Sequence, residues 1–190
     1  MNSEHQIIRR KTRKIFVGDV PVGGDSPITV QSMTNTLTND VESTSDQIKQ
    51  LSDAGADIVR VSVPDQEAAD AFRKIKKRSP VPLVADIHFD YTMALEAIKG
   101  KADCIRINPG NIGKEEKIRE VIAAAKDTNT PIRVGINAGS LERKLQVKYG
   151  EPNSDALVES AMNHINILKK YNFEDFKLSI KASDVHLTIE

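Results

Sequence analysis

Short apolar segments alternate with amphipathic stretches along most of this chain. Six such segments follow residue 27, and they read ITVQSM, ADIVRVSVP, VPLVADIHF, ADCIRINPG, TPIRVGINAGS and FKLSIKAS. In the stretch between the first two, Val41, Ile48 and Leu51 share one face of a helix that we expect to end before Gly55. This alternation of strand and helix patterns predicts repeated βα units around a parallel sheet.

Local signals predict where several elements begin and end. The segment IFVGDVPVGGDSPITV alternates and carries paired glycines, so we expect a hairpin within residues 1–27, with the βα units occupying residues 28–190. Gly100 is expected to cap one helix at its C-terminus, and Ser154 is expected to be the N-cap of another.

Polar and apolar side chains alternate within the predicted strands. Arg60 and Ser62 share one strand face, whereas Val59, Val61 and Val63 share the other, and the remaining strands repeat this division. An open doubly wound sheet with helices on both faces would favour apolar residues at both parities. A barrel needs only its outer face apolar, so the pattern favours an α/β fold of the (β/α)₈ TIM-barrel type.

The number of strands falls short of a complete barrel. The sequence has six strand-like segments, whereas a complete barrel has eight strands and typically about 250 residues. The near copies ADIVRV at 56–61 and ADCIRI at 102–107 support a structure of repeated units. We therefore expect residues 1–190 to form the N-terminal part of a TIM barrel truncated to about six βα units.

Net charge and composition exclude several kinds of binding partner. Lys and Arg total 27 and Asp and Glu total 27, so there is no net charge that would favour nucleic acid or a membrane surface. The basic clusters at 9–14 and 73–78 are interpreted as the start of the hairpin and the solvated face of a helix. No apolar run approaches the roughly 20 residues of a membrane span, and a single Cys suits a reducing compartment. We expect a cytoplasmic protein that binds neither nucleic acid nor membrane.

The candidate site is a group of polar side chains near the carboxyl ends of the predicted strands, where barrel enzymes place their active sites. By strand parity its members face inward; they are Arg60, Asp86, His88, Arg106, Asn108, Arg133, Asn137, Lys181 and Ser183. Three arginines and a lysine then share one cavity with Asp86 as the obvious counter-charge. Such cations repel one another unless an anion joins them. Because arginine binds phosphate oxygens bidentately, the sequence predicts a phosphate or diphosphate ligand.

Alternative roles exist for individual members of this group. Arg60 and Arg106 could instead form ion pairs with the nearby Asp57 and Asp103. His88 is as compatible with a buried core histidine as with a proton-transfer group. Cys104 shares the inward parity of Arg106 but lies lower in the barrel, where we expect it to pack inertly.

Several long motifs resemble the bacterial 4-hydroxy-3-methylbut-2-enyl diphosphate synthase family. They are VQSMTNT at 30–36, GADIVRVSVP at 55–64, LVADIHFD at 83–90, RINPGNIG at 106–113, RVGINAGSL at 133–141, KYGEP at 148–152 and SIKASD at 179–184. The motifs keep the order they have in the family and cover nearly the whole chain.

The resemblance implies a TIM barrel that holds the diphosphate of 2-C-methyl-D-erythritol 2,4-cyclodiphosphate during its reductive ring opening, a late step of non-mevalonate isoprenoid biosynthesis. The diphosphate-gripping positions it implies are Arg60, Arg106, Arg133, Asn137 and Lys181, with Asp86, His88, Asn108 and Ser183 in or near the same pocket. It also implies a homodimer, flavodoxin or ferredoxin as electron donor, and a [4Fe–4S] cluster held by three Cys and a Glu in a separate C-terminal domain.

This chain departs from the family pattern in its cysteines. One Cys cannot supply the cluster thiolates, so we expect the cluster domain to be absent from this chain, no metal to be bound by it, and the isolated chain to be inactive. The acidic catalytic residue of the family is also expected to lie beyond Glu190. Two other interpretations stay open: a pterin-binding barrel of the dihydropteroate synthase type, which the four cations disfavour, and a non-catalytic diphosphate-binding module.

Overall fold

A curved parallel sheet of six strands forms the centre of the molecule. The computed structural model describes residues 10–108 and 111–190, so the expectations for residues 1–9, which include Arg9, and for Pro109 and Gly110 fall outside the described residues. The strands lie side by side in chain order, and they are β3 (Gln31–Met33), β4 (Ile58–Ser62), β5 (Leu83–Ile87), β6 (Cys104–Ile107), β7 (Ile132–Asn137) and β8 (Phe176–Lys181). All five neighbouring pairs are parallel, as the βα pattern predicted.

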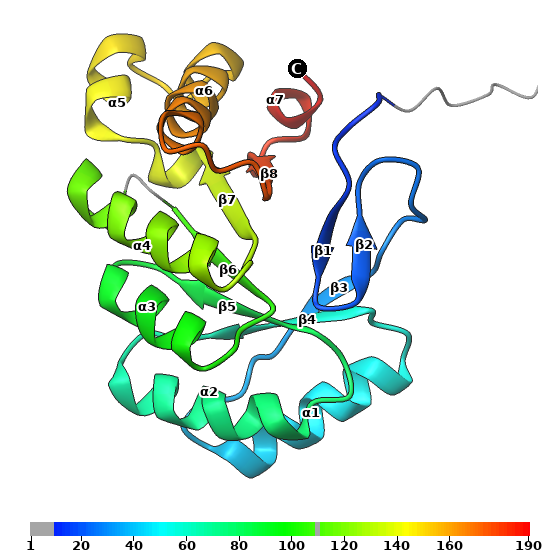
Figure 1. Cartoon of the computed structure of the whole chain (residues 1–190). Coiled ribbons are helices and arrows are strands. Elements are labelled where there is room, and N and C mark those ends of the chain that lie inside the picture. Colours follow the sequence, from blue (N-terminus) through cyan, green and yellow to red (C-terminus); the bar gives the residue numbers. More distant parts are fainter. Residues whose placement is uncertain (1–9, 109–110) are drawn as a thin grey trace, which may run out of the picture.

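Helices follow the strands and lie on the outer face of the curved sheet (Figure 1). They are α1 (Val41–Asp53), α2 (Gln66–Arg78), α3 (Tyr91–Lys99), α4 (Glu115–Asp127), α5 (Arg143–Tyr149), α6 (Ser154–Lys170) and α7 (Val185–Ile189), with a short 3₁₀ turn, η1, at Ala138–Ser140. Among the described residues, none of these helices has the length and apolar character needed to cross a bilayer. The arrangement is that of a truncated TIM barrel with six βα units and an open sheet, in agreement with the predicted fold class.

The core between sheet and helices is built from the apolar parity of the strands. Val59 and Val61 of β4 are fully buried, as are Phe72 and Ile75 on the inner face of α2. These residues belong to one continuous cluster that includes the corresponding positions of β5, β6 and β7. The helix that carries the basic cluster at 73–78 therefore packs by its apolar side, as predicted. Burial of each large aliphatic side chain contributes roughly 1.5–3 kcal/mol to folding.

The edge strand β8 is covered less completely than the others. Leu178 and Ile180 have the outward parity, yet they are 38% and 40% exposed. The following helix, α7, is only five residues long, and β8 has no neighbour on its other side among the described residues. Apolar side chains and backbone groups of β8 therefore remain accessible.

An N-terminal hairpin packs against the inner side of the sheet at the amino ends of its strands. Its antiparallel strands are β1 (Ile15–Val17) and β2 (Val20–Val22). Val17 is fully buried in a second cluster that also contains Val84 and Cys104. Burial raises the pKa of the Cys104 thiol to about 11, which agrees with the expected packing role.

Of the two predicted helix caps, the structure confirms one and corrects the other. The N-cap of α6 is Asn153, whose side chain accepts a hydrogen bond from the amide of Ala156 at 2.9 Å, so the expectation for Ser154 was wrong by one residue. Asn and Ser are almost equally good N-caps, and only the extended backbone of Asn153 decides between them. Gly100 is the C-cap of α3, as predicted, and the left-handed residue is the next one, Lys101, with φ of 63°.

Candidate functional site

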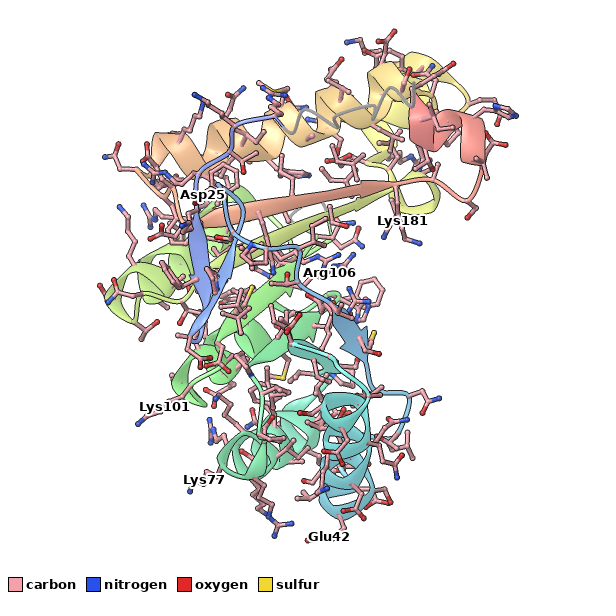
Figure 2. The ribbon with its side chains drawn as sticks, turned by 90° about the vertical axis from the view of Figure 1, so that its right-hand side faces the viewer. Asp25, Glu42, Lys77, Lys101, Arg106 and Lys181 are labelled. Atoms are coloured by element: carbon pink, nitrogen blue, oxygen red, sulfur yellow. The ribbon has the colours of Figure 1, made fainter. Side chains whose placement is uncertain are left out.

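A cavity of about 500 Å³ opens at the carboxyl ends of the strands. Polar side chains dominate its lining, which consists of Arg60, Asp86, His88, Phe89, Arg106, Asn108, Asn111, Arg133, Asn137, Ser140, Ser179 and Lys181. The structure thus brings together eight of the nine residues predicted from strand parity. Figure 2 shows Arg106 and Lys181 of this group on the concave side of the sheet.

The ninth predicted residue, Ser183, does not line this cavity. Strand β8 ends at Lys181, and Ser183 lies exposed beyond that end. The prediction assumed that side chains go on alternating after Lys181, which holds only while the backbone stays extended. Ser179, two residues before Lys181 on the same face, lines the cavity instead.

Asp86 is the buried centre of the charged cluster. Its side chain is 2% exposed, and its Oδ1 accepts a hydrogen bond from Arg106 Nη1 at 3.2 Å. The Nε of Arg60 lies 3.3 Å from Asp86 Oδ2, so one carboxylate serves two guanidinium groups. The strand register explains why Asp86 reaches both arginines. Asp86 of β5 stands beside Arg106 of β6 on one side and beside Ser62 of β4 on the other, and Arg60 shares the strand face of Ser62.

The alternative ion pairs of Arg60 and Arg106 are absent from the described residues. Asp57 accepts a hydrogen bond from the amide of Val30 at 2.7 Å, and Asp103 accepts one from the amide of Leu83 at 2.7 Å. Both aspartates therefore fix the amino ends of strands, at the end of the barrel opposite to the cavity. The prediction that Asp86 is the counter-charge of the two arginines is confirmed.

Arg133 is a cation of the cavity with no carboxylate partner among the described residues. Its Nη1 donates to Gln31 Oε1 and its Nη2 donates to Ser179 Oγ, each at 3.0 Å. Burial lowers the pKa of Arg133, and the positive charge of Arg60 lowers it further. The surroundings of Arg133 thus disfavour its positive charge, and a bound anion would offset that cost.

Gly135 makes room for the guanidinium of Arg106. A Cβ atom at this position of β7 would lie 2.4 Å from Arg106 Nε and 2.5 Å from Nη2. The side chain of Arg106 therefore rests on the backbone of the neighbouring strand, where it is 9% exposed. Any residue other than glycine would displace this guanidinium, so Gly135 belongs to the site although it carries no chemistry itself.

His88 and Phe89 form the mouth of the cavity. The His88 side chain is 42% exposed, and its Nε2 lies 3.7 Å from Asp86 Oδ2, so the interpretation as a buried core histidine is wrong. Phe89 is 75% exposed and contributes the aromatic surface of the lining. Phe89 was not among the predicted site residues; the available signal was an apolar residue two positions after the end of β5. Deeper in the cavity, Asn108 Nδ2 donates to Ser140 Oγ at 3.2 Å.

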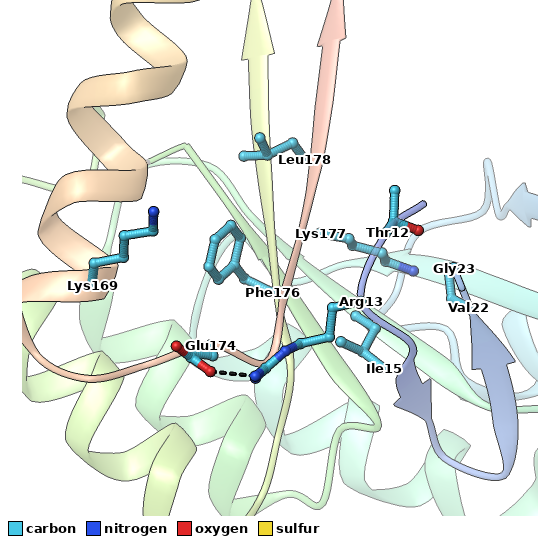
Figure 3. Close-up of a pocket in the computed structure, with 10 residues that line it drawn as sticks. All are labelled: Thr12, Arg13, Ile15, Val22, Gly23, Lys169, Glu174, Phe176, Lys177 and Leu178. Carbon is cyan, nitrogen blue, oxygen red and sulfur yellow. Dashed lines mark ion pairs between the residues drawn. The ribbon is translucent and has the colours of Figure 1, made fainter. Parts of the chain in front are cut away.

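A second cavity of about 520 Å³ lies between the hairpin and β8 (Figure 3). Its lining is largely apolar, with Ile15, Val22 and Phe176 among its residues, and an ion pair joins Arg13 to Glu174 beside it. It opens at the amino ends of the strands, because Phe176 is the first residue of β8. Barrel enzymes do not place their chemistry at this end, so the first cavity is the stronger candidate.

Metal ligands are scarce in the part of the chain that the structure describes. No group of three or more His, Cys, Asp and Glu side chains is placed there to hold a metal ion. The one cysteine, Cys104, is fully buried, and its raised pKa opposes the thiolate form that a cluster requires. The described residues therefore do not fit an iron–sulfur cluster.

Fold and site together define a class: a parallel βα barrel segment with a cavity at the carboxyl ends of its strands that is rich in cationic side chains. A family model described as the GcpE TIM-barrel domain matches residues 12–190, and the chain belongs to that family. Over 190 residues it is 62% identical to the 4-hydroxy-3-methylbut-2-en-1-yl diphosphate synthase (flavodoxin) of Alcanivorax borkumensis, covering 100% of this chain and 51% of the relative. The protein of the same name from Actinobacillus succinogenes is 63% identical over 184 residues, covering 97% and 50%. The chain thus spans about half the length of these curated relatives.

Solved structures with a similar fold are distant in sequence. The Yersinia pestis dihydropteroate synthase has a TM-score of 0.62 at 13% identity, covering 87% of this chain and 61% of its own. A Thermotoga maritima phospho-2-dehydro-3-deoxyheptonate aldolase has a TM-score of 0.61 at 14% identity, covering 92% and 48%. Identities this low show a shared barrel fold and nothing about the ligand, so they give no support to the pterin interpretation.

Proposed function

We propose that this chain forms the substrate cradle of a 4-hydroxy-3-methylbut-2-enyl diphosphate synthase, which opens 2-C-methyl-D-erythritol 2,4-cyclodiphosphate reductively. The observation that carries the proposal is the cavity in which four cationic side chains from four strands face one buried carboxylate. The names of the curated relatives support a diphosphate product and flavodoxin as partner of the whole protein. A cytoplasmic location and assembly as a homodimer belong to the same proposal.

Charge and shape favour a diphosphate as the ligand. Arg60, Arg106 and Arg133 supply planar forks that match phosphate oxygens, while Lys181 supplies a point charge. Asp86 compensates one of these four charges, so a dianion offsets most of the remainder and a trianion offsets all of it. Because the cavity holds about 500 Å³, a small cyclic diphosphate fits within it.

The residues of this chain would bind and orient the substrate. Asp86 holds Arg60 and Arg106 in place before the ligand arrives, which reduces the entropy lost on binding. Asn108 and Asn137 add neutral donors, and the exposed ring of Phe89 offers an apolar surface to the carbon skeleton. The described residues provide no ligand set for a cluster, so the electron-transfer step is not assigned to any of them.

Calorimetric titration with inorganic diphosphate tests the proposal. Arg106→Ala should weaken binding by about 10-fold to 150-fold, because a charge-assisted hydrogen bond contributes roughly 1.5–3 kcal/mol. Arg106→Lys should recover part of the loss, since it keeps the charge but not the fork. Arg73→Ala, which removes an arginine paired with Asp70 and Glu96 on the outer helices, is the matched control and should bind like the parent.

Two results would count against the proposed function. A parent chain that does not bind diphosphate would exclude the cradle. A chain that binds a reduced pterin in preference to diphosphate, with no effect of Arg106→Ala, would favour the pterin-binding alternative instead.

A further inference from the structure

A buried polar cluster joins helix α6 to the loop that follows β7, outside the cavity. Ser160 Oγ donates to Glu142, with distances of 2.9 Å to Oε1 and 2.8 Å to Oε2. His164 Nε2 lies 2.7 Å from Glu142 Oε1. Ser160 and His164 are one helical turn apart and only 1% and 5% exposed, so both point from the same face of α6 onto the carboxylate.

The loop held by this cluster forms one wall of the cavity. It begins where β7 ends at Asn137, passes through η1, and reaches Glu142 through Leu141, which is 4% exposed in the core. Ser140, two residues before Glu142, accepts the hydrogen bond of Asn108 and lines the cavity. The loop is therefore fixed from both sides, with Ser140 turned toward the ligand space and Glu142 turned toward α6.

Stability alone is a poor explanation of this cluster. Neither ring nitrogen of His164 has a well-aligned hydrogen-bond partner among the described residues, although Nε2 lies close to Glu142 Oε1, and burying such groups costs free energy that an apolar side chain would not cost. Burial alone would raise the pKa of Glu142, but the contacts with His164, the backbone and Ser160 hold it below its ordinary value. The cluster thus keeps a charged carboxylate in one defined position, as buried polar networks do when they specify a conformation.

We propose that Glu142, fixed by Ser160 and His164, is a positioning residue for the anion site. Glu142 is not among the residues that line the cavity. It sets the path of the loop from Asn137 to Glu142 and thereby the position of Ser140 and Asn137 in the cavity wall. This inference rests on the proposed function, because its effect is expressed in diphosphate affinity.

Three variants and one control test the inference on the full chain. Glu142→Ala should weaken the binding of inorganic diphosphate about 10-fold, and Ser160→Ala should weaken it several-fold. Glu142→Gln should retain most of the affinity, because its amide oxygen still accepts the hydrogen bond of Ser160. The control is Glu159→Ala, which removes the contacts of Glu159 with Lys148 and Tyr149 and so loosens α5 from α6 without touching the loop. It should bind diphosphate like the parent.

A second measurement separates positioning from general loosening of the fold. The amide resonances of Gly139 and Ser140 should shift in Glu142→Ala and Ser160→Ala, and return toward the parent positions in Glu142→Gln. If Glu142→Ala does not fold, Ser160→Ala decides the question, since it is nearly isosteric and removes a single donor.

The outcomes distinguish this inference from the proposed function. If the parent binds diphosphate and both alanine variants bind it equally well, the positioning role is wrong while the cradle stands. If Glu159→Ala weakens binding as much as Glu142→Ala, the effect is a general consequence of loosening α6, and the inference also fails. A parent that does not bind diphosphate overturns both.

Discussion

Replacing Asp86 with Asn should destabilise the empty chain and make it depend on diphosphate. Asp86 is almost fully buried and lies within 3.3 Å of two arginine side chains. An amide at this position keeps the shape of the carboxylate but removes its charge. Arg60, Arg106 and Arg133 would then face one another with no carboxylate among the described cavity residues.

The size of the effect follows from the burial of the partners. Removing one partner of a buried ion pair costs about 3–5 kcal/mol. The Arg60 side chain is 24% exposed, and the cavity opens to solvent. We therefore expect the free energy of unfolding to fall by about 3 kcal/mol, the lower end of this range. For a chain of 190 residues this corresponds to a fall in Tm of roughly 6–12 °C.

Diphosphate should reverse much of this loss. The carboxylate of Asp86 also repels a bound anion. At an effective dielectric constant of about 20, two unit charges about 6 Å apart interact by roughly 3 kcal/mol. Asp86→Asn therefore removes a repulsion of about this size between residue 86 and the diphosphate. Thermal and urea unfolding with and without diphosphate should therefore show a larger ligand-induced stabilisation in Asp86→Asn than in the parent. Asp70→Asn is the control, because its ion pair with Arg73 is on an exposed helix face and should change stability by less than about 1 kcal/mol.

Either of two results would refute this reasoning. Asp86→Asn as stable as the parent would mean that the arginines do not repel one another. Asp86→Asn that is destabilised but gains no more from diphosphate than the parent would mean that Asp86 acts only as a packing and hydrogen-bonding group.

Three further predictions concern other parts of the chain. Gly135→Ala should weaken diphosphate binding several-fold in calorimetry, because the new methyl group displaces the guanidinium of Arg106; an unchanged affinity would show that the guanidinium adapts freely. Cys104 should resist iodoacetamide at pH 8 in the folded chain and react in urea, since burial raises its pKa to about 11 and the thiolate is the nucleophile; rapid native alkylation would contradict its placement. The chain should self-associate through the open edge of β8, and Ile180→Lys should reduce this association in sedimentation velocity because it places a charge beside that edge; equal association of variant and parent would locate the contact elsewhere.

Alternation along the strands was enough to predict much of the site. A period of two separates the buried row of β4 from Arg60, and the same rule places Arg106, Arg133 and Lys181 in the cavity. The rule failed at Ser183 because β8 ends two residues earlier. Periodicity predicts which face a side chain occupies, but it does not report where an extended backbone stops.

Contacts between distant segments could not be predicted in the same way. The hydrogen bond from Arg133 to Gln31 joins β7 to β3, which are not neighbours in the sheet, and no local pattern specifies it. The packing of Val17 against Cys104 and the contact of Glu142 with His164 likewise join segments that are adjacent only after folding. Such pairs depend on the final arrangement of the sheet and helices, so the sequence alone left them open.

Resonances of the arginine side chains test the central claim most directly. In a diphosphate titration followed by ¹⁵N NMR, the Nε signals of Arg60, Arg106 and Arg133 should shift together along one saturable curve, because all three line one cavity. Those of Arg73 and Arg78, which pair with carboxylates on the outer helices, should stay unchanged. Equal shifts in all five arginines, or shifts confined to Arg73 and Arg78, would contradict the account that this cavity is where the chain binds a diphosphate.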